Sequence, residues 1–374
     1  MRRLLEYQAE QIEAVLASHK APVRVTGGSV LPQLVQFDLM PGQGVSVRQV
    51  QRYSEEVALA LGVSSARVAR QGGTLFLQVP RSSPKPVRLL DLQSRLTRVP
   101  PDTAILGMDE TGAPLLLRLP SPEVSHVLIA GTTGSGKTVL LRSMVLSLVM
   151  NNRPRQLQLV LLDPKGHGFG PLNGLPHLLQ PVVSSATEAL VVLAGLVREM
   201  EHRDRAGNNR PIIVVVIDEL ADLALVGGKT MERFMTRLVQ RGRQAGIHVI
   251  ACTQKPTAAV VGTLVKANFP ARLVGAVVSP EDAKVATGVA GTGAERLTGR
   301  GDFLLLVRGE MVRLQAAYAS TQEIDQVACK LCPQSSRKQS TRSPHSPKQK
   351  VIRLAETFRA GAARQMELWQ HTAG

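Results

Sequence analysis

Cysteine, aromatic residues and long apolar runs are all scarce in this sequence. Three cysteines among 374 residues are too few for a disulfide framework, which indicates a reducing compartment. Aromatic residues make up only 3% of the chain, which disfavours single-strand binding by stacking of bases on aromatic side chains. No apolar run reaches the roughly 18 residues of a membrane span, and the first residues do not resemble a signal peptide. We therefore expect a cytoplasmic protein without an integral membrane segment.

Acidic residues are outnumbered by basic ones. The chain has 45 Lys and Arg against 29 Asp and Glu, which gives a net charge of +16 at pH 7. This excess favours a polyanionic partner, either a nucleic acid or a membrane surface. Hydrophobic residues make up 44% of the chain, which excludes a wholly disordered protein. The length is typical of two or three domains.

Changes in residue pattern divide the chain into five segments. Residues 1–20 have helical apolar spacing and predict an amino-terminal helix. Residues 21–97 have short apolar segments around a helical stretch, which predicts a small α+β domain, and residues 98–120 are interpreted as a connection. In residues 121–320 apolar runs alternate with helical stretches, which predicts an α/β domain with a mostly parallel sheet. Residues 321–374 are interpreted as a basic, partly disordered tail.

A glycine-rich sequence follows the apolar strand expected at residues 127–130 and precedes a helical stretch. It matches the phosphate-binding pattern G-x-x-x-x-G-K-[ST] in the strand, loop and helix context that the pattern requires. Backbone N–H groups of such a loop surround phosphates, Lys137 reaches the β- and γ-phosphates, and Thr138 supplies a hydroxyl group to Mg²⁺. The expected nucleotide-binding residues are Gly131, Thr132, Thr133, Gly134, Ser135, Gly136, Lys137, Thr138 and Val139.

Polar residues follow two further apolar strands. The unbroken β-branched run at residues 212–217 ends in Asp218 and Glu219, where open α/β sheets place their ligands. We assign Asp218 to the Mg²⁺ shell and Glu219 to orienting or deprotonating the attacking water. A third strand, at residues 247–252, leads to Gln254, whose amide could sense the γ-phosphate. Together with Lys137, these residues predict an NTP hydrolase.

Six segments together resemble the FtsK/SpoIIIE family of DNA translocases. The matching segments are Leu128–Thr138, Asp163–Lys165, Gly174–Leu179, Val216–Leu223, Arg243–His248 and Thr253–Pro256. The resemblance covers about residues 21–318 and implies a RecA-like P-loop NTPase domain after a small α+β domain. It also implies a homo-hexameric ring that uses ATP and Mg²⁺ to move double-stranded DNA through a central channel.

In such a ring the ATP lies between subunits, so a neighbouring subunit can supply an arginine to the transition state. Arg243 matches the family's arginine and is the first choice, with Arg272 as the second. The segment Gly299–Asp302 also matches the family, but no role follows for Asp302. Cys329 and Cys332 form a single C-x-x-C pair, too few ligands for a zinc site.

Several alternatives stay open at this point. A similar ATPase could move protein cargo in secretion, and a conjugation coupling protein or packaging motor could act on other forms of DNA. A non-enzymatic DNA-binding ring could use ATP as a switch, although Lys137, Asp218 and Glu219 argue against it. The biological process could be chromosome segregation or DNA transfer, with a membrane-bound, recombinase or relaxase partner.

Overall fold

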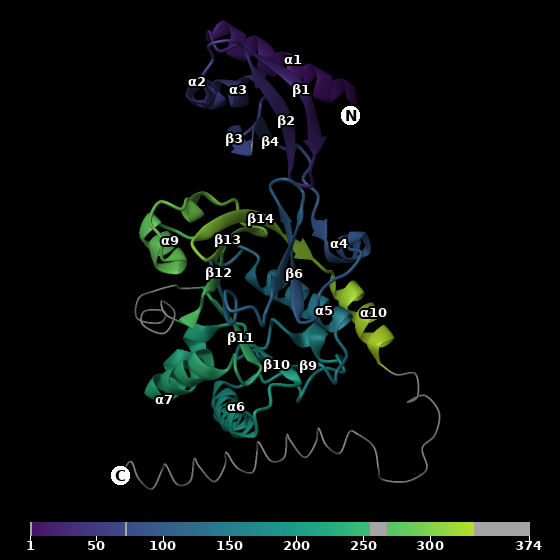
Figure 1. Cartoon of the computed structure of the whole chain (residues 1–374), viewed down its shortest axis with the longest axis vertical. Coiled ribbons are helices and arrows are strands. Elements are labelled where there is room, and N and C mark those ends of the chain that lie inside the picture. The colour runs from purple at the N-terminus through teal and green to yellow at the C-terminus, as the bar shows by residue number, and fades with distance from the viewer. Residues whose placement is uncertain (1, 72, 255–267, 333–374) are drawn as a thin grey trace. The chain divides into compact units, whose positions relative to one another are not determined.

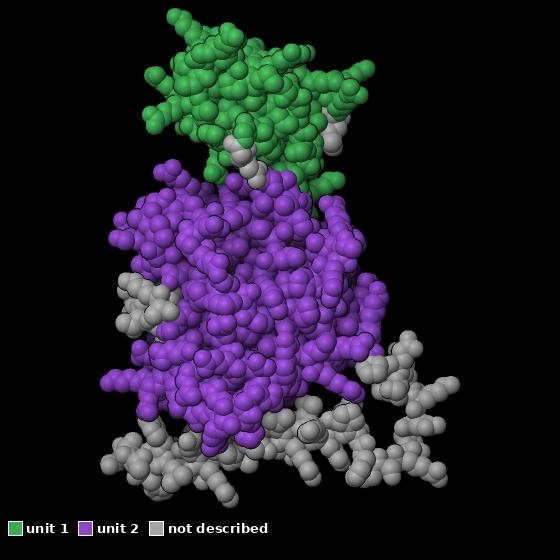
Figure 2. All heavy atoms as spheres, in the orientation of Figure 1, with its two compact units in different colours: residues 1–87 green, residues 88–374 purple. Residues whose placement is uncertain are grey.

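The computed structural model describes residues 2–71, 73–254 and 268–332. The chain forms two compact units that divide between Val87 and Arg88 (Figures 1 and 2). Each unit has its own β-sheet and its own hydrophobic core. The short strand β5 (Val87–Arg88) lies at the division.

The first unit is an α+β fold built on a four-stranded antiparallel sheet with the strand order β1-β2-β4-β3. Its elements are α1 (Arg2–Ser18), β1 (Val23–Val30), β2 (Leu34–Pro41), α2 (Val47–Arg52), α3 (Ser54–Ala60), β3 (Arg67–Gln71) and β4 (Thr74–Pro80). The alternating pattern of β4 buries Leu75 and Leu77 against Ile12 and Leu16 of α1. The amino-terminal helix is therefore part of this core.

The second unit begins at Arg88, directly before α4, and contains a large mixed sheet (Figure 1). Its elements are α4 (Leu89–Arg95), β6 (Thr103–Asp109), β7 (Pro114–Arg118), β8 (Val127–Ala130), α5 (Lys137–Asn151), β9 (Leu157–Leu162), η1 (Gly170–Leu172), α6 (Ala186–Ala206), β10 (Ile212–Ile217), α7 (Leu220–Arg241), β11 (Ile247–Thr253), β12 (Ala271–Val274), α9 (Pro280–Thr287), η2 (Ala294–Arg296), β13 (Asp302–Val307), β14 (Glu310–Tyr318) and α10 (Thr321–Leu331).

The large sheet has a parallel half and an antiparallel half. Its strands pair in the order β7-β6-β14-β13-β12-β8-β11-β10-β9. The strands from β9 to β12 in this order are parallel to one another, whereas β12, β13, β14, β6 and β7 pair antiparallel. Strand β8 lies between β11 and β12, so the strand order reverses beside it. Such a switch point is where open α/β sheets bind ligands.

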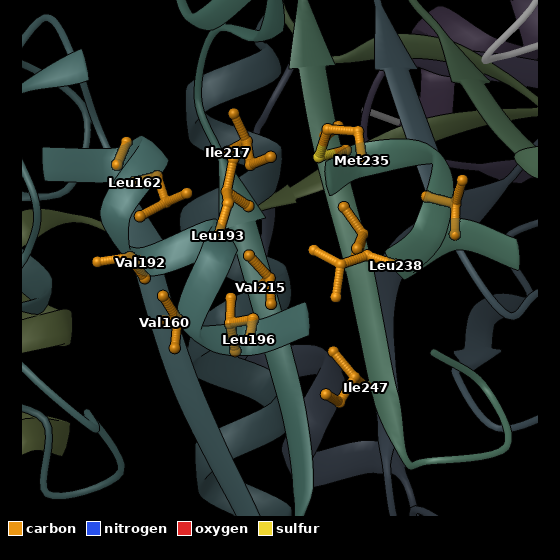
Figure 3. Packing of buried hydrophobic residues seen from close by; sticks show 14 of the residues in the cluster. Val160, Leu162, Val192, Leu193, Leu196, Val215, Ile217, Met235, Leu238 and Ile247 are labelled. Atoms are coloured by element: carbon orange, nitrogen blue, oxygen red, sulfur yellow. The ribbon is translucent and has the colours of Figure 1, made fainter. Parts of the chain in front are cut away.

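A hydrophobic core holds α6 and α7 against the parallel strands (Figure 3). Val215 of β10 is fully buried among side chains that include Leu196 of α6 and Leu238 of α7. All six residues of β10 are buried, as expected for a central strand covered on both faces. Helix α5 packs near β6 and β14 and is buried on nearly every side. The strand ends are therefore held in fixed positions.

Three segments differ from those expected from the sequence. Residues 98–120 are not a simple connection, because they supply β6 and β7 to the large sheet and bury Ile105 and Leu117. The second unit starts at Arg88, so residues 88–97 belong with the larger body. Residues 321–331 form α10, which buries Ile324 and Val327. The remainder of the expected tail, residues 333–374, lies outside the described residues.

Among the helices of the described residues, none combines the length and apolar character needed to cross a membrane.

Candidate nucleotide-binding site

The phosphate-binding loop runs from Gly131 to Gly136, between the buried strand β8 and the first residue of α5. Gly134 has a φ of 84° and Gly136, which caps the helix, has a φ of 101°. Glycine adopts such angles at no steric cost. The backbone N–H groups of a loop of this kind and the N-terminus of the helix form an anion-binding concavity. The loop thus has the backbone that phosphate binding requires.

Hydrogen bonds hold this loop in place. Thr132 donates to the carbonyl oxygen of Ala276 from its N–H at 2.8 Å and from its hydroxyl group at 3.0 Å. The Ser135 hydroxyl group donates to the Thr132 carbonyl oxygen at 2.8 Å, and so does Nζ of Lys137, also at 2.8 Å. Lys137 is only 6% exposed, and burial lowers the pKa of its ammonium group. The cationic side chain is therefore poised next to the loop.

Asp218 lies directly beside the first turn of α5. The Thr138 hydroxyl group donates to Oδ1 of Asp218 at 3.1 Å. Burial raises the pKa of Asp218 above its ordinary value, and the nearby Asp163 carboxylate adds to this effect. A cation would lower it again. A hydroxyl and a carboxylate oxygen are the hard ligands that Mg²⁺ takes from proteins beside substrate phosphates, so the residues fit this ion.

Glu219 is buried at the amino end of α7. It is 2% exposed, and its carboxylate accepts hydrogen bonds from the N–H of Ala221 at 3.4 Å and of Gln254 at 3.3 and 3.2 Å. Burial raises the pKa of Glu219, while these hydrogen bonds and the charge of Lys165 oppose the rise. The carboxylate is consequently fixed in position and more basic than an exposed one.

Gln254 connects the end of β11 to the phosphate-binding loop. Its side-chain Oε1 accepts a hydrogen bond from the Thr133 hydroxyl group at 2.9 Å. Val139 lies in the first turn of α5 and is partly exposed. The structure therefore brings the loop, Asp218, Glu219 and Gln254 together at the carboxyl ends of β8, β10 and β11.

A neighbouring loop, Asp163–Phe169, also belongs to this site but was given no role from the sequence. The buried Asp163 carboxylate accepts hydrogen bonds from the N–H groups of Gly166, Gly168 and Phe169 at 3.0, 2.7 and 3.0 Å. Asp163 follows strand β9, so its position at the end of a buried strand is the signal that could have identified it. Its carboxylate organises the loop beside Asp218.

Lys165 in this loop is a cation next to Glu219. Its Nζ lies 3.9 Å from Oε2 of Glu219 and 3.2 Å from Oδ2 of Asp222. The Lys165 side chain is 42% exposed, so solvent screens part of this attraction. Lys165 is therefore positioned to tune the basicity of Glu219.

We expect the substitution Lys165→Met to shift the pH dependence of ATP hydrolysis. Removing the cation raises the pKa of Glu219, so the acidic limb of the kcat profile should move to higher pH by about half a unit to one unit. The measurement is kcat against pH for the full chain. Lys284→Met, at an exposed lysine of α9, is the matched control and should leave the profile in place. An unchanged acidic limb in Lys165→Met would contradict this role.

The two candidate arginines lie outside the loop, one before β11 and the other within β12. Arg243 precedes β11, whose seven residues at about 3.3 Å each place it roughly 20 Å from Gln254. Its Nε donates to the Pro120 carbonyl oxygen at 3.5 Å. Arg272 is partly buried in β12, where it pairs with Leu128 in the middle of β8. The structure thus separates Arg243 from the site that Lys137 and Glu219 form, whereas Nε of Arg272 donates to the Phe269 carbonyl oxygen at 3.3 Å.

The cysteine pair lies elsewhere, at the carboxyl end of α10. Cys329 and Cys332 are exposed free thiols. Within residues 2–71, 73–254 and 268–332, no three His, Cys, Asp or Glu side chains gather in a way that could hold a metal ion.

Fold and site together define a P-loop ATPase. The sequence model of the FtsK/SpoIIIE family matches residues 88–208 and 202–258, and the model of the FtsK alpha domain matches residues 2–81. The chain belongs to the FtsK/SpoIIIE family. The resemblance inferred from the sequence and the α/β P-loop fold are therefore confirmed.

Two relatives show the extent of the similarity. DNA translocase FtsK of Sporosarcina ureae is 33% identical over 358 residues, which cover 87% of this chain and 45% of that protein. DNA translocase SftA of Bacillus subtilis is 33% identical over 352 residues, which cover 86% of this chain and 37% of that protein. The chain thus spans less than half the length of these relatives.

Solved structures share the fold. The pCW3 conjugation coupling protein TcpA, in a monomer form with ATPγS, has a TM-score of 0.60 at 18% identity, covering 87% of this chain and 98% of that one. The cytoplasmic domain of the Thermomonospora curvata type VII secretion ATPase EccC has a TM-score of 0.59 at 24% identity, covering 70% of this chain and 36% of that one. At these identities the likeness concerns the fold alone.

Proposed function

We propose that this chain is an ATP-dependent double-stranded DNA translocase that works as a homo-hexameric ring. The observation that carries the proposal is the division of the site. Lys137, Asp218 and Glu219 meet at the carboxyl ends of the parallel strands, whereas Arg243 lies beyond the amino end of β11. In a ring, the surface of one subunit that carries Arg243 would face the nucleotide site of the next subunit and complete it.

The proposed chemistry assigns one task to each group. Lys137 and the N–H groups of the loop hold the ATP phosphates, and Thr138 with Asp218 would hold Mg²⁺. When bound, Mg²⁺ would supply positive charge that offsets the negative charge of the phosphates. Glu219 orients the attacking water and accepts its proton, and Gln254 senses the γ-phosphate.

The arginine of the neighbouring subunit would complete this set. Arg243 is exposed next to the amino end of β11, and its guanidinium would stabilise the charge of the transition state on the adjacent subunit's ATP. Hydrolysis would then occur only at an interface between subunits. This requirement couples ATP turnover to the assembled ring.

The cargo is proposed from charge and family. A net charge of +16 suits the phosphate backbone of a duplex, and both curated relatives described above are named DNA translocases. Such a ring would act in the cytoplasm, where ATP and DNA are available. Chromosome segregation and DNA transfer both need a motor of this kind, and a recombinase, relaxase or membrane-bound partner would direct it.

The direct test measures ATP hydrolysis by the full chain with and without long double-stranded DNA at moderate salt. We expect strong stimulation by the duplex, weaker stimulation by single strands, and no activity in Lys137→Ala. Displacement of a third strand from a triplex on the same DNA then measures translocation itself. A rate that DNA does not change, in a chain that binds ATP, would contradict the DNA translocase and favour a protein cargo.

A further inference from the structure

The turn Gly299–Asp302 lies directly against the phosphate-binding loop, although more than 150 residues separate the two in the sequence. The N–H of Arg300 donates to the Gly134 carbonyl oxygen at 3.0 Å, and the N–H of Gly301 donates to that of Ser135 at 2.8 Å. A Cβ atom on Gly136 would lie 2.8 Å from the Gly301 nitrogen, so the two backbones are in tight contact. This turn therefore packs directly against the backbone of the phosphate-binding loop.

Hydrogen bonds to β14 hold the other side of the Gly299–Asp302 turn. Ala316 of β14 donates its N–H to the Gly301 carbonyl oxygen at 2.7 Å, and Nε2 of Gln315 donates to the Arg300 carbonyl oxygen at 2.9 Å. Asp302 accepts two hydrogen bonds from the Arg313 guanidinium, both at 2.8 Å. The backbone of Arg300 is therefore clamped between the phosphate-binding loop and β14.

Arg300 has a conformation that favours glycine. Its φ is 51°, and its neighbours Gly299 and Gly301 have φ values of 74° and 95°. A non-glycine residue in this region is strained, and such residues persist where the surrounding structure holds them, often at functional sites. A third glycine would relieve the strain, so the arginine has a cost that its side chain must offset.

The Arg300 side chain is exposed beside the loop. Within the described ranges, its guanidinium makes no hydrogen bond or ion pair. The nucleotide site to which this loop belongs holds the acidic side chains of Asp163, Asp218 and Glu219 and the cations Lys137 and Lys165. A triphosphate would add several negative charges to this set. A further guanidinium is the group that such a ligand would attract.

We propose that the Arg300 guanidinium binds a phosphate oxygen of the nucleotide held by the loop of its own subunit. The proposal deepens the nucleotide site described above and rests on it. The clamped backbone fixes the Cα atom of Arg300 next to the loop, and the side chain becomes ordered when its guanidinium binds the phosphate. Arg300 is thus a binding residue in cis, distinct from an arginine supplied by a neighbour.

The test measures the dissociation constants of ADP and ATPγS for the full chain by calorimetry, together with the melting temperature. Arg300→Ala and Arg300→Gly should weaken binding of one or both nucleotides by about tenfold to a hundredfold, and Arg300→Lys by less. Arg300→Gly should melt at the same temperature or about 2 °C higher, because glycine relieves the strain. Loss of affinity in a chain that is no less stable identifies a binding contact.

Arg296→Ala is the matched control, because Arg296 is an exposed arginine of the same loop that pairs with Glu295. It should bind both nucleotides as the unchanged chain does. Equal losses in Arg296→Ala and Arg300→Ala would mean a general charge effect and overturn the proposal. Unchanged nucleotide affinity in Arg300→Ala, with a lower DNA-stimulated rate, would overturn it in favour of a contact to DNA or a neighbour. Failure of the unchanged chain to bind nucleotide would instead contradict the nucleotide site itself.

Discussion

Glu219→Gln should lower kcat for ATP hydrolysis by about 10²- to 10⁴-fold while ATP binding is retained. The change keeps the size of the side chain but removes the carboxylate that would accept the proton of the attacking water. The N–H groups of Ala221 and Gln254 can still donate to the amide oxygen, so the position of the side chain should persist. Steady-state ATPase rates and the dissociation constant of ATPγS check both parts.

Asp222→Asn is the control for this experiment. Asp222 also lies beside Lys165, but its side chain is 33% exposed and is not held by the amides that fix Glu219. We expect its kcat to change by less than about tenfold. A Glu219→Gln chain that hydrolyses ATP at the original rate would refute the assignment of Glu219 and support a ring that binds ATP only as a switch.

Arg243→Ala should lower kcat by about 10³- to 10⁵-fold, the range typical of an arginine supplied across an interface. Because Arg243 lies roughly 20 Å from Gln254 of its own chain, the effect should arise between subunits. Mixing Arg243→Ala with Lys137→Ala subunits tests this directly. Interfaces that combine the intact loop of the first with the intact arginine of the second should hydrolyse ATP, although each variant alone is inactive.

Two comparisons make the mixing experiment decisive. Arg241→Ala removes a nearby arginine that pairs with Asp204 at 2.8 Å, and it should retain most of the activity. A second mixture combines Arg272→Ala subunits, which lack the second candidate arginine, with Lys137→Ala subunits. If Arg243→Ala alone keeps full activity, and a mixture of Arg272→Ala with Lys137→Ala subunits recovers ATP hydrolysis that each variant alone lacks, the role belongs to Arg272. No recovery in either mixture would contradict an arginine acting in trans.

The nucleotide loop could be predicted from the sequence because its chemistry is local. Eight consecutive residues, Gly131–Thr138, specify the turn, the lysine and the hydroxyl group, and the flanking strand and helix supply the context. Asp218 followed from one further rule, that ligands gather at the carboxyl ends of parallel strands. The same rule applied to Leu157–Leu162 would have led to Asp163.

Other features depend on contacts that no local pattern records. Residues 98–120 are predicted to be a connection, but β6 pairs with β14, about 200 residues later in the chain, and β7 pairs with β6. The clamp between Gly134 and Arg300 likewise joins distant segments through backbone atoms, which carry no residue-specific signal. Helix α10 could have been predicted from the sequence, because the spacing of Ile324, Val327 and Ala328 places them on one face of a helix.

Because the two units have separate cores, a bound nucleotide should stabilise only one of them against unfolding. A nucleotide that binds the folded second unit stabilises it by about 2.7 kcal/mol at a hundred times the dissociation constant. The core of the first unit, around Ile12 and Leu77, includes none of the residues of the nucleotide site. Mg-ATPγS should therefore slow amide hydrogen exchange in β8, β10 and α5 and leave the rates in β2 and β4 unchanged. The stabilisation by the nucleotide would then be limited to the second unit. The first unit would keep the same stability in the nucleotide-free and the nucleotide-bound states.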